Sequence, residues 1–477
     1  MLGLKKNVIS NFILTASTIL LPLITFPYVT RTLSNISLGN VFFVDAFTQY
    51  FILFSSLGIP YYGIREVAKL KGDAKQVSTL VFDLIILQVA LSIITIITFF
   101  VFGAFLPKLS GVSSLIEIGS IMILASSFLI EWFFQGIENF AYITKRSLVF
   151  KGLSVLSILL FVKAKGDSEI YYLILTLVVF CNALLNFFFF LKYHSQPYQI
   201  SKNILRHLRP LIVLFSINVS VSVYVILDSI ILGFLTDAVN VSYYNIPLKL
   251  VKIFWMIIAG IGTVFIPRIS SYYASNDMDS IQLLMNKSIS IVCLLSLPFC
   301  FACLLFPKEI LVIISGEQYL TAASALQVLS CIPLIIGICN VFGSQFLLPI
   351  GREKHILHAT MIGLIVSLLL NFLLIPYYKF LGSAIAAVAA ELSVCIFVFF
   401  SARKYIKITF DYLLLVQIAI CLSTSFVFYL LVRKYAAGIY IIIGTGIIYI
   451  ISLVLTQFYF KNKFLLALLD FSRRVKV

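Results

Sequence analysis

The chain has 477 residues, of which 61% are hydrophobic and only 11% are charged, and its formal net charge is +16. So apolar a chain has no polar segment long enough to form a soluble domain that does chemistry in water. The positive charges lie scattered in short stretches between apolar runs, which argues against nucleic acid as a partner.

About fourteen apolar stretches, each roughly as long as a bilayer is thick, follow one another along the chain. Only helices and closed barrels satisfy their backbone groups in lipid, and barrel strands alternate polar with apolar residues. Runs such as Phe187-Phe188-Phe189-Phe190 do not alternate. We therefore predict an all-α integral membrane protein with about 14 transmembrane helices, near residues 8–30, 38–62, 78–105, 114–137, 147–163, 169–191, 209–235, 241–266, 286–306, 321–349, 357–377, 382–402, 412–432 and 438–460.

The distribution of Lys and Arg predicts the orientation of these helices. If the amino end lies in the cytoplasm, the inner loops carry about three times as many Lys and Arg residues as the outer loops. Merging or dropping one span would destroy this bias. We therefore expect both termini in the cytoplasm.

A weak internal repeat predicts two lobes. The segment that begins at Arg31 resembles the one at Gly233, roughly 200 residues later, and Gly58-Ile-Pro60 similarly resembles Phe265-Ile-Pro267. Repeats in the same orientation are a transporter architecture, with the substrate site between the halves. The predicted parts are an N-terminal six-helix lobe (1–195), a C-terminal six-helix lobe (196–408), and two additional helices with a basic cytoplasmic tail (409–477).

Basic residues within the spans are candidates for substrate binding, because a charge at the bilayer centre costs about 2.5–3.5 kcal/mol. Lys249 and Lys252 are three residues apart and therefore share one helix face. This pair predicts a cationic cavity wall for a phosphate-bearing substrate; the alternative is a structural pairing with Asp45 or Asp228. Arg31, at the outer end of the first span, either snorkels to the interface or faces an outward vestibule.

Five carboxylates within the spans are candidates for ion coupling or for lining a cavity: Asp45, Asp83, Glu131, Asp228 and Glu391. A buried carboxyl such as Glu131 could carry a proton. Asp83 lies near the inner end of its span, where an interfacial position is the alternative. Glu391 follows a run of small residues, so a packing role is its alternative.

Motifs of soluble catalysis are absent from the sequence. It has no phosphate-binding Gly-rich loop, no paired metal ligands and no nucleophile elbow. Cys300-Phe-Ala-Cys303 lies within a span without His or acidic neighbours, which favours packing thiols. We therefore expect no enzyme activity, no cofactor and no metal site.

Three segments carry a resemblance to a known family: residues 21–33, residues 58–66, and Glu131-Trp-Phe-Phe-Gln-Gly-Ile-Glu138 with Lys145-Arg146. They resemble the polysaccharide-biosynthesis flippases, the Wzx-type O-antigen transporters of the multidrug/oligosaccharidyl-lipid/polysaccharide exporter superfamily. The resemblance covers nearly the whole chain and implies two six-helix lobes plus two extra helices.

The resemblance also implies a function. Members flip undecaprenyl-pyrophosphate-linked oligosaccharide repeat units from the inner to the outer leaflet of the bacterial inner membrane. It implies a cationic central cavity, H⁺ or Na⁺ antiport, and the polymerase and chain-length machinery of the pathway as partners. Arg31 and Lys249 match positions where the family carries cations. Ser34-Asn35 departs from the Gly-Pro that is frequent there.

Two rival functions remain open at this stage. A cation-coupled multidrug exporter of the same fold would need an acidic, aromatic cavity, and the paired lysines argue against it. A membrane glycan-polymerising enzyme would need catalytic loops on the outer face. The predicted outer loops are short except near residues 307–321.

Overall fold

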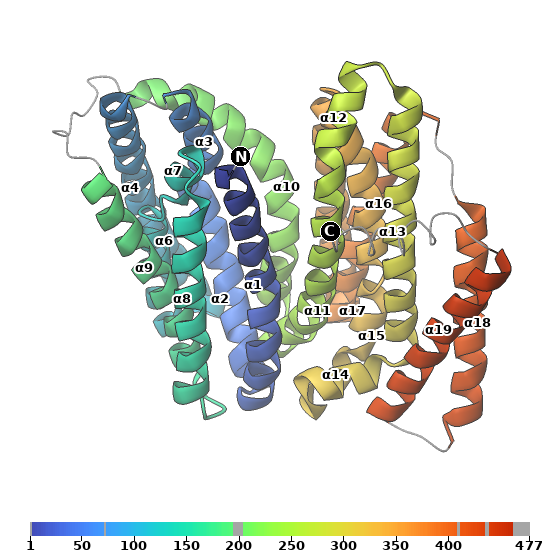
Figure 1. Ribbon diagram of the computed structural model, residues 1–477. Coiled ribbons are helices and arrows are strands. Elements are labelled where there is room, and N and C mark those ends of the chain that lie inside the picture. The colour runs from blue at the N-terminus through green and yellow to red at the C-terminus, as the bar shows by residue number, and fades with distance from the viewer. Residues whose placement is uncertain (1, 71–72, 194–203, 408–410, 435–437, 461–477) are drawn as a thin grey trace. The chain divides into compact units, whose positions relative to one another are not determined.

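The computed structural model describes residues 2–70, 73–193, 204–407, 411–434 and 438–460, and all regular elements in these ranges are helices (Figure 1). This confirms the predicted all-α fold. Residues 194–203, which join the predicted spans 169–191 and 209–235, and the basic tail after residue 460 lie outside the described residues. The chain divides into two compact units, Met1–Asn245 with Asn371–Phe380, and Ile246–Leu370 with Leu381–Val477. The lobe boundaries expected from the repeat, at 195 and 408, stay predictions.

The first unit contains the helices up to the start of α11. They are α1 (Leu2–Thr32), α2 (Asn35–Ser56), α3 (Ile59–Lys69), α4 (Ala74–Phe105), α5 (Pro107–Ser110), α6 (Ser113–Ser126), α7 (Glu131–Gly136), α8 (Phe140–Phe161), α9 (Ser168–Tyr193), the 3₁₀ turn η1 (Ile204–His207) and α10 (Leu208–Leu235). Within this unit α1 packs against α8, and α6 packs against α9 and α2.

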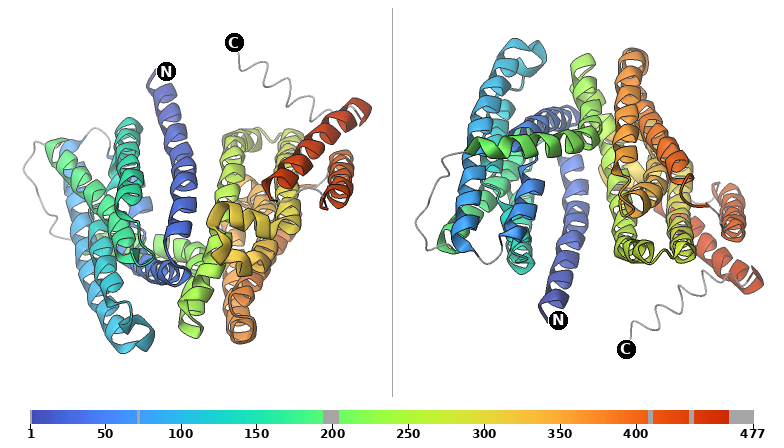
Figure 2. Two further views of the ribbon diagram at one scale, coloured as in Figure 1. Left: turned by 90° about the horizontal axis from the view of Figure 1, so that it is seen from below. Right: turned by 90° about the horizontal axis from the view of Figure 1, so that it is seen from above.

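The second unit begins within α11 (Ala238–Gly262). It continues with η2 (Thr263–Phe265), α12 (Ile266–Ala274), α13 (Met278–Leu305), α14 (Pro307–Ser315), η3 (Glu317–Ala322), α15 (Ala323–Leu329), α16 (Ile332–Phe342), the π-helical turn η4 (Gly343–Leu347), α17 (Glu353–Ala402), α18 (Tyr412–Val432) and α19 (Ile439–Phe460). The last two helices pack side by side, as all three views show (Figures 1 and 2).

Ten helices of the described chain are long and apolar enough to cross a membrane. One of them, α17, covers two predicted spans, because its helical ladder is broken only at Lys379, whose φ is 50° and ψ is −128°. α1, α8 and α10 coincide with the remaining predicted spans. The protein is therefore a multi-pass membrane protein.

The same local motif occurs in each unit and agrees with the repeat in the sequence. In the first, Pro60 occupies the first turn of α3, and Asp73 then caps α4 by accepting from the backbone N–H of Gln76 at 3.0 Å. In the second, Pro267 occupies the first turn of α12, and Asp277 caps α13 at the same distance. Proline suits a first helical turn and aspartate suits an N-cap, so each motif ends one helix and begins the next.

Each unit has its own apolar core, and many large apolar side chains also point outward. Trp132, Phe133 and Phe134 belong to the core of the first unit, and Phe342, Phe346 and Leu347 to that of the second. Phe458 and Tyr459 on α19 are among the many exposed ones. An exposed apolar surface of this extent is what a lipid-facing protein requires.

Candidate functional site

The lysine pair lies in α11, on the turns that follow Pro247. Lys249 and Lys252 are both half-buried, in a helix whose neighbouring positions Leu250 and Val251 are buried. Spaced by three, they lie on one face of the helix, as the sequence predicts. Two ammonium groups so close together in an apolar helix raise each other's energy, so negative charge beside them, from a ligand or from protein carboxylates, would stabilise this face.

Arg31 lies in the other compact unit, in the last turn of α1, and is exposed. A cation at this position interacts favourably with the negative end of the helix dipole. The helix continues for one residue past Arg31, and Ser34 then caps α2 by accepting from the N–H of Ser37 at 3.1 Å. The turn that the sequence singled out is therefore built on a serine N-cap.

Asp228, one of the five predicted carboxylates, is buried and accepts hydrogen bonds from two other helices. It is 4% exposed, and its two oxygens accept from different helices. The hydroxyl of Tyr244 on α11 donates to one oxygen at 3.0 Å, and the amide of Asn371 on α17 donates to the other at 2.6 Å. The next residue, Ser229, donates to Asn245 at 3.1 Å.

This arrangement joins α10, α11 and the first half of α17 through one carboxylate within the first unit. Tyr244 and Asn371 are both neutral donors, so they do not cancel its charge. A proton or Na⁺ that bound Asp228 would compete with Tyr244 and Asn371 for the same oxygens. An ion that bound there would therefore alter the packing of three helices.

Asp83 is fully buried and lies beside the turn that begins α10. Its Oδ2 is 3.5 Å from Nε2 of His207 and 3.9 Å from the guanidinium of Arg206. The other ring nitrogen of His207 bonds to the hydroxyl of Tyr62 at 2.8 Å. Burial, followed by the neighbouring Arg206, lowers the pKa of His207. Through its contacts with Tyr62 and Asp83, His207 packs η1 against α3 and α4.

Glu131 pairs with Arg146, which the sequence had assigned to an inner loop. The guanidinium of Arg146 donates to Glu131 from a position that is 6% exposed. Its Nε and Nη1 have no hydrogen-bond partner among the described residues, and its Cζ lies 5.6 Å from the ring centre of Tyr142. Glu131 is thus one half of an ion pair at the start of α7, after a break in the span.

The remaining two carboxylates differ in setting. Asp45 is half-buried and accepts from Gln49, one turn on, at 3.4 Å. Glu391 is 9% exposed and follows the small residues of α17. A Cβ added at Gly363 would lie 2.5 Å from Val394, so the two halves of α17 pack closely beside Glu391.

The pattern of charged residues in the sequence does not reveal several partners of the predicted site residues. Tyr244 and Asn371 are uncharged, so nothing in a search for intramembrane charge selects them. Arg146 was missed because it stands near the end of a weakly apolar run, where a basic residue resembles a loop residue. The signal that could have found it is Glu131, which needs a cationic partner.

In the part of the chain that the structure describes, no group of three or more His, Cys, Asp or Glu side chains could hold a metal ion.

Residues 4–273 match the family described as "Polysaccharide biosynthesis protein", and residues 210–373 match the family described as "MatE". A protein of Escherichia coli K12 named "Putative O-antigen transporter" is 26% identical over 82% of this chain and 94% of its own length. A Shigella dysenteriae protein of the same name is 24% identical over 83% of this chain and 98% of its own length.

Two solved structures show the fold. The lipid II flippase MurJ in an inward closed conformation has a TM-score of 0.76 at 14% identity, covering 95% of this chain and 98% of that one. An inward-facing multidrug resistance transporter of the MATE family has a TM-score of 0.62 at 15% identity, covering 81% and 94%. The fold is therefore that of membrane transporters.

Proposed function

Because the chain belongs to the polysaccharide biosynthesis protein family, we propose that it is a flippase for lipid-linked glycans. Its substrates are undecaprenyl-pyrophosphate-linked oligosaccharide repeat units of the O-antigen type, which it carries from the cytoplasmic to the outer leaflet. The names of the relatives, which are transporters rather than enzymes, support this assignment.

The observation that carries the proposal is the pair of half-buried lysines on α11. A pyrophosphate supplies the negative charge that Lys249 and Lys252 favour, and Arg31 adds a cation at the end of α1. The sugars occupy polar surface while the prenyl tail remains in lipid. In a cell whose interior is negative, moving a charge of −2 outward releases about 4–5 kcal/mol per 100 mV.

Return of the empty carrier requires a second energy input, and Asp228 is the best-placed coupling residue. Its carboxylate is buried and bonded by neutral donors from two helices. H⁺ or Na⁺ entering from outside would displace Tyr244 or Asn371 and so change the packing of α10 against α11 and α17. Asp45, Asp83, Glu131 and Glu391 are secondary candidates for the same role.

The proposed location is the bacterial inner membrane with both termini in the cytoplasm, as the bias of Lys and Arg toward the inner loops favours. Partners there are the polymerase and chain-length machinery that act on the flipped units.

The experiment is transport by purified protein in vesicles. A fluorescent undecaprenyl-pyrophosphate oligosaccharide is loaded in one leaflet, and its appearance in the other is followed under an imposed H⁺ or Na⁺ gradient. We expect flipping that the gradient accelerates in wild type and not in Asp228→Asn. Asp411→Asn, at the cap of α18, is the control for loss of a carboxylate.

The competing function is export of organic cations, which the match to the MatE family favours. The same vesicles test it with ethidium. Ethidium efflux without glycan-lipid flipping would replace the flippase assignment with a drug exporter.

A further inference from the structure

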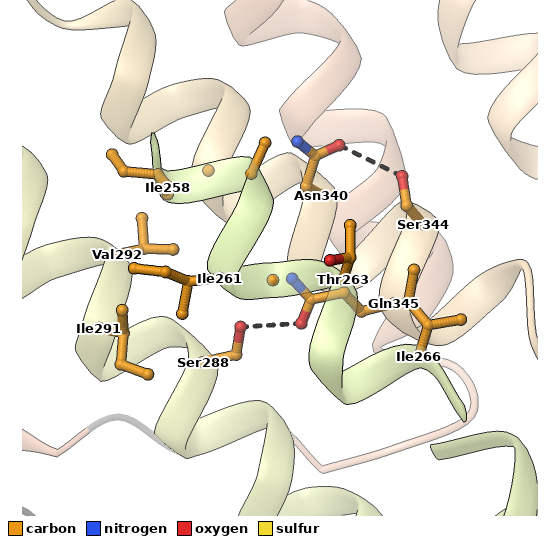
Figure 3. A pocket seen from close by; sticks show the side chains of 13 residues that line it. Ile258, Ile261, Thr263, Ile266, Ser288, Ile291, Val292, Asn340, Ser344 and Gln345 are labelled. Atoms are coloured by element: carbon orange, nitrogen blue, oxygen red, sulfur yellow. Dashed lines mark hydrogen bonds between the residues drawn. The ribbon is translucent and has the colours of Figure 1, made fainter. Parts of the chain in front are cut away.

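A small cavity with a mainly apolar wall and a few polar groups lies in the second unit, where α11 breaks, and none of its lining side chains is charged (Figure 3). Its volume is about 110 Å³, which exceeds the space for one water molecule several-fold. α11, α13 and α16 with η4 surround it. The cavity is therefore separate from the lysine pair one to four turns earlier in α11.

The polar part of the wall is built by hydroxyl and amide groups. Ser288 donates to the Oε1 of Gln345 at 2.8 Å, and Ser344 donates to the Oδ1 of Asn340 at 3.2 Å (Figure 3). Such groups both donate and accept, which is the pattern that sugar hydroxyls require.

The backbone brings these groups together by two irregular features. α16 ends in the π-helical turn Gly343–Leu347, which places Ser344 and Gln345 at the cavity, and such turns recur at functional sites. On the facing side α11 ends at Gly262, where a Cβ would lie only 2.5 Å from the Nε2 of Gln345. A side chain larger than glycine would push this amide out of its place.

The cavity runs from a buried floor to an accessible rim. Gln345 and Ser288 are 4% and 2% exposed, whereas Thr263 at the rim is exposed and Ile261 is 37% exposed. Aliphatic side chains, Ile258 and Ile291 among them, supply the rest of the wall. A sugar ring presents the same combination of hydroxyl edges and apolar C–H faces.

We propose that this cavity binds a neutral, hydroxyl-rich sugar residue of the carried glycan. The inference rests on the proposed function and adds a second contact region: the lysine pair takes the charged headgroup, and the cavity takes an uncharged sugar. A sugar acid or a phosphate is disfavoured, because no lining residue offers a charge to offset the loss of its hydration.

Protection of a cysteine at the rim tests this without requiring transport. Thr263→Cys is labelled with a maleimide in detergent micelles, and the labelling rate is compared with that of the wild-type protein, whose own cysteines give the background. The probes are three ligands with one alkyl chain: octyl glucoside, octyl glucuronide and octyl phosphate. We expect octyl glucoside to slow labelling several-fold and the two anionic ligands to have no effect.

Two additional substitutions in the Thr263→Cys background examine the wall. Asn340→Leu and Ser344→Ala each remove hydrogen-bonding groups, and we expect octyl glucoside to bind about fivefold more weakly in each. Ser423→Ala is the matched control, because its hydroxyl bonds one turn back on the exposed side of α18. Thermal unfolding of every variant verifies that it folds.

The outcomes separate this inference from the flippase proposal. Equal protection by all three ligands, no protection by any, or full protection in both wall variants would overturn the sugar site. Specific protection by octyl glucoside together with a failure to flip glycan lipids would leave the sugar site standing and count against the flippase.

Discussion

The hydrogen bond from Tyr244 to Asp228 makes a quantitative prediction about stability. The carboxylate is 4% exposed, so water cannot replace a donor that is removed. A hydrogen bond to a charged group contributes about 1.5–3 kcal/mol. Tyr244→Phe deletes only the hydroxyl and keeps the ring, which is 1% exposed and buried in its place. We therefore expect the free energy of unfolding to fall by about 2 kcal/mol.

The control is the neighbouring residue. Tyr243→Phe on the same helix removes a hydroxyl that accepts a long hydrogen bond, at 3.4 Å, from Asn35. We expect a loss of about 0.5 kcal/mol or less. Both variants are unfolded by denaturant in micelles at pH 7.5. Equal losses in the two variants at pH 7.5 would refute the role given to the Tyr244 hydroxyl.

Two further predictions concern the first unit. His207 is buried and its pKa is lowered, so its neutral form stabilises the fold above the ordinary pKa of about 6.5. This stabilisation is lost as the pH falls through the lowered pKa. The melting temperature should therefore decline less from pH 7 to pH 5 in His207→Gln than in wild type, whereas the exposed His358→Gln should match wild type. Gly63→Ala places a Cβ 2.2 Å from the Trp132 ring and should lower the free energy of unfolding by about 1–3 kcal/mol. In the control Gly152→Ala, the added Cβ meets nothing within 4 Å and should not destabilise the protein. Equal melting temperatures of the two variants would contradict the close contact at Gly63.

The helical architecture could be predicted from the sequence because lipid imposes it. About 20 apolar residues in a row have no other stable form in a bilayer. Pro60 and Pro267, which only the repeat had singled out, occupy the first turns of α3 and α12, since proline lacks the N–H that a first turn does not need. The break within α17 was predictable too, since its non-helical residue, Lys379, falls between the predicted spans 357–377 and 382–402.

The surroundings of the charged residues were less accessible to prediction. Lys249 and Lys252 could be placed on one face by spacing alone. The partners of Asp228 are neutral, and one of them, Asn371, lies 143 residues away in sequence. Arg146 shows a different difficulty. Its position near a span end suggests a solvated charge, yet the structure buries it, because Glu131 after the break in the span neutralises it.

The most direct test of the central claim is the rate of glycan-lipid flipping in vesicles by the double variant Lys249→Gln and Lys252→Gln. Glutamine keeps most of the side-chain length and removes only the charge, and Lys287→Gln, an exposed lysine on α13, is the control. If the pair binds the pyrophosphate, the double variant loses at least tenfold in rate while the control keeps the wild-type rate. A double variant that flips at the wild-type rate would contradict the claim.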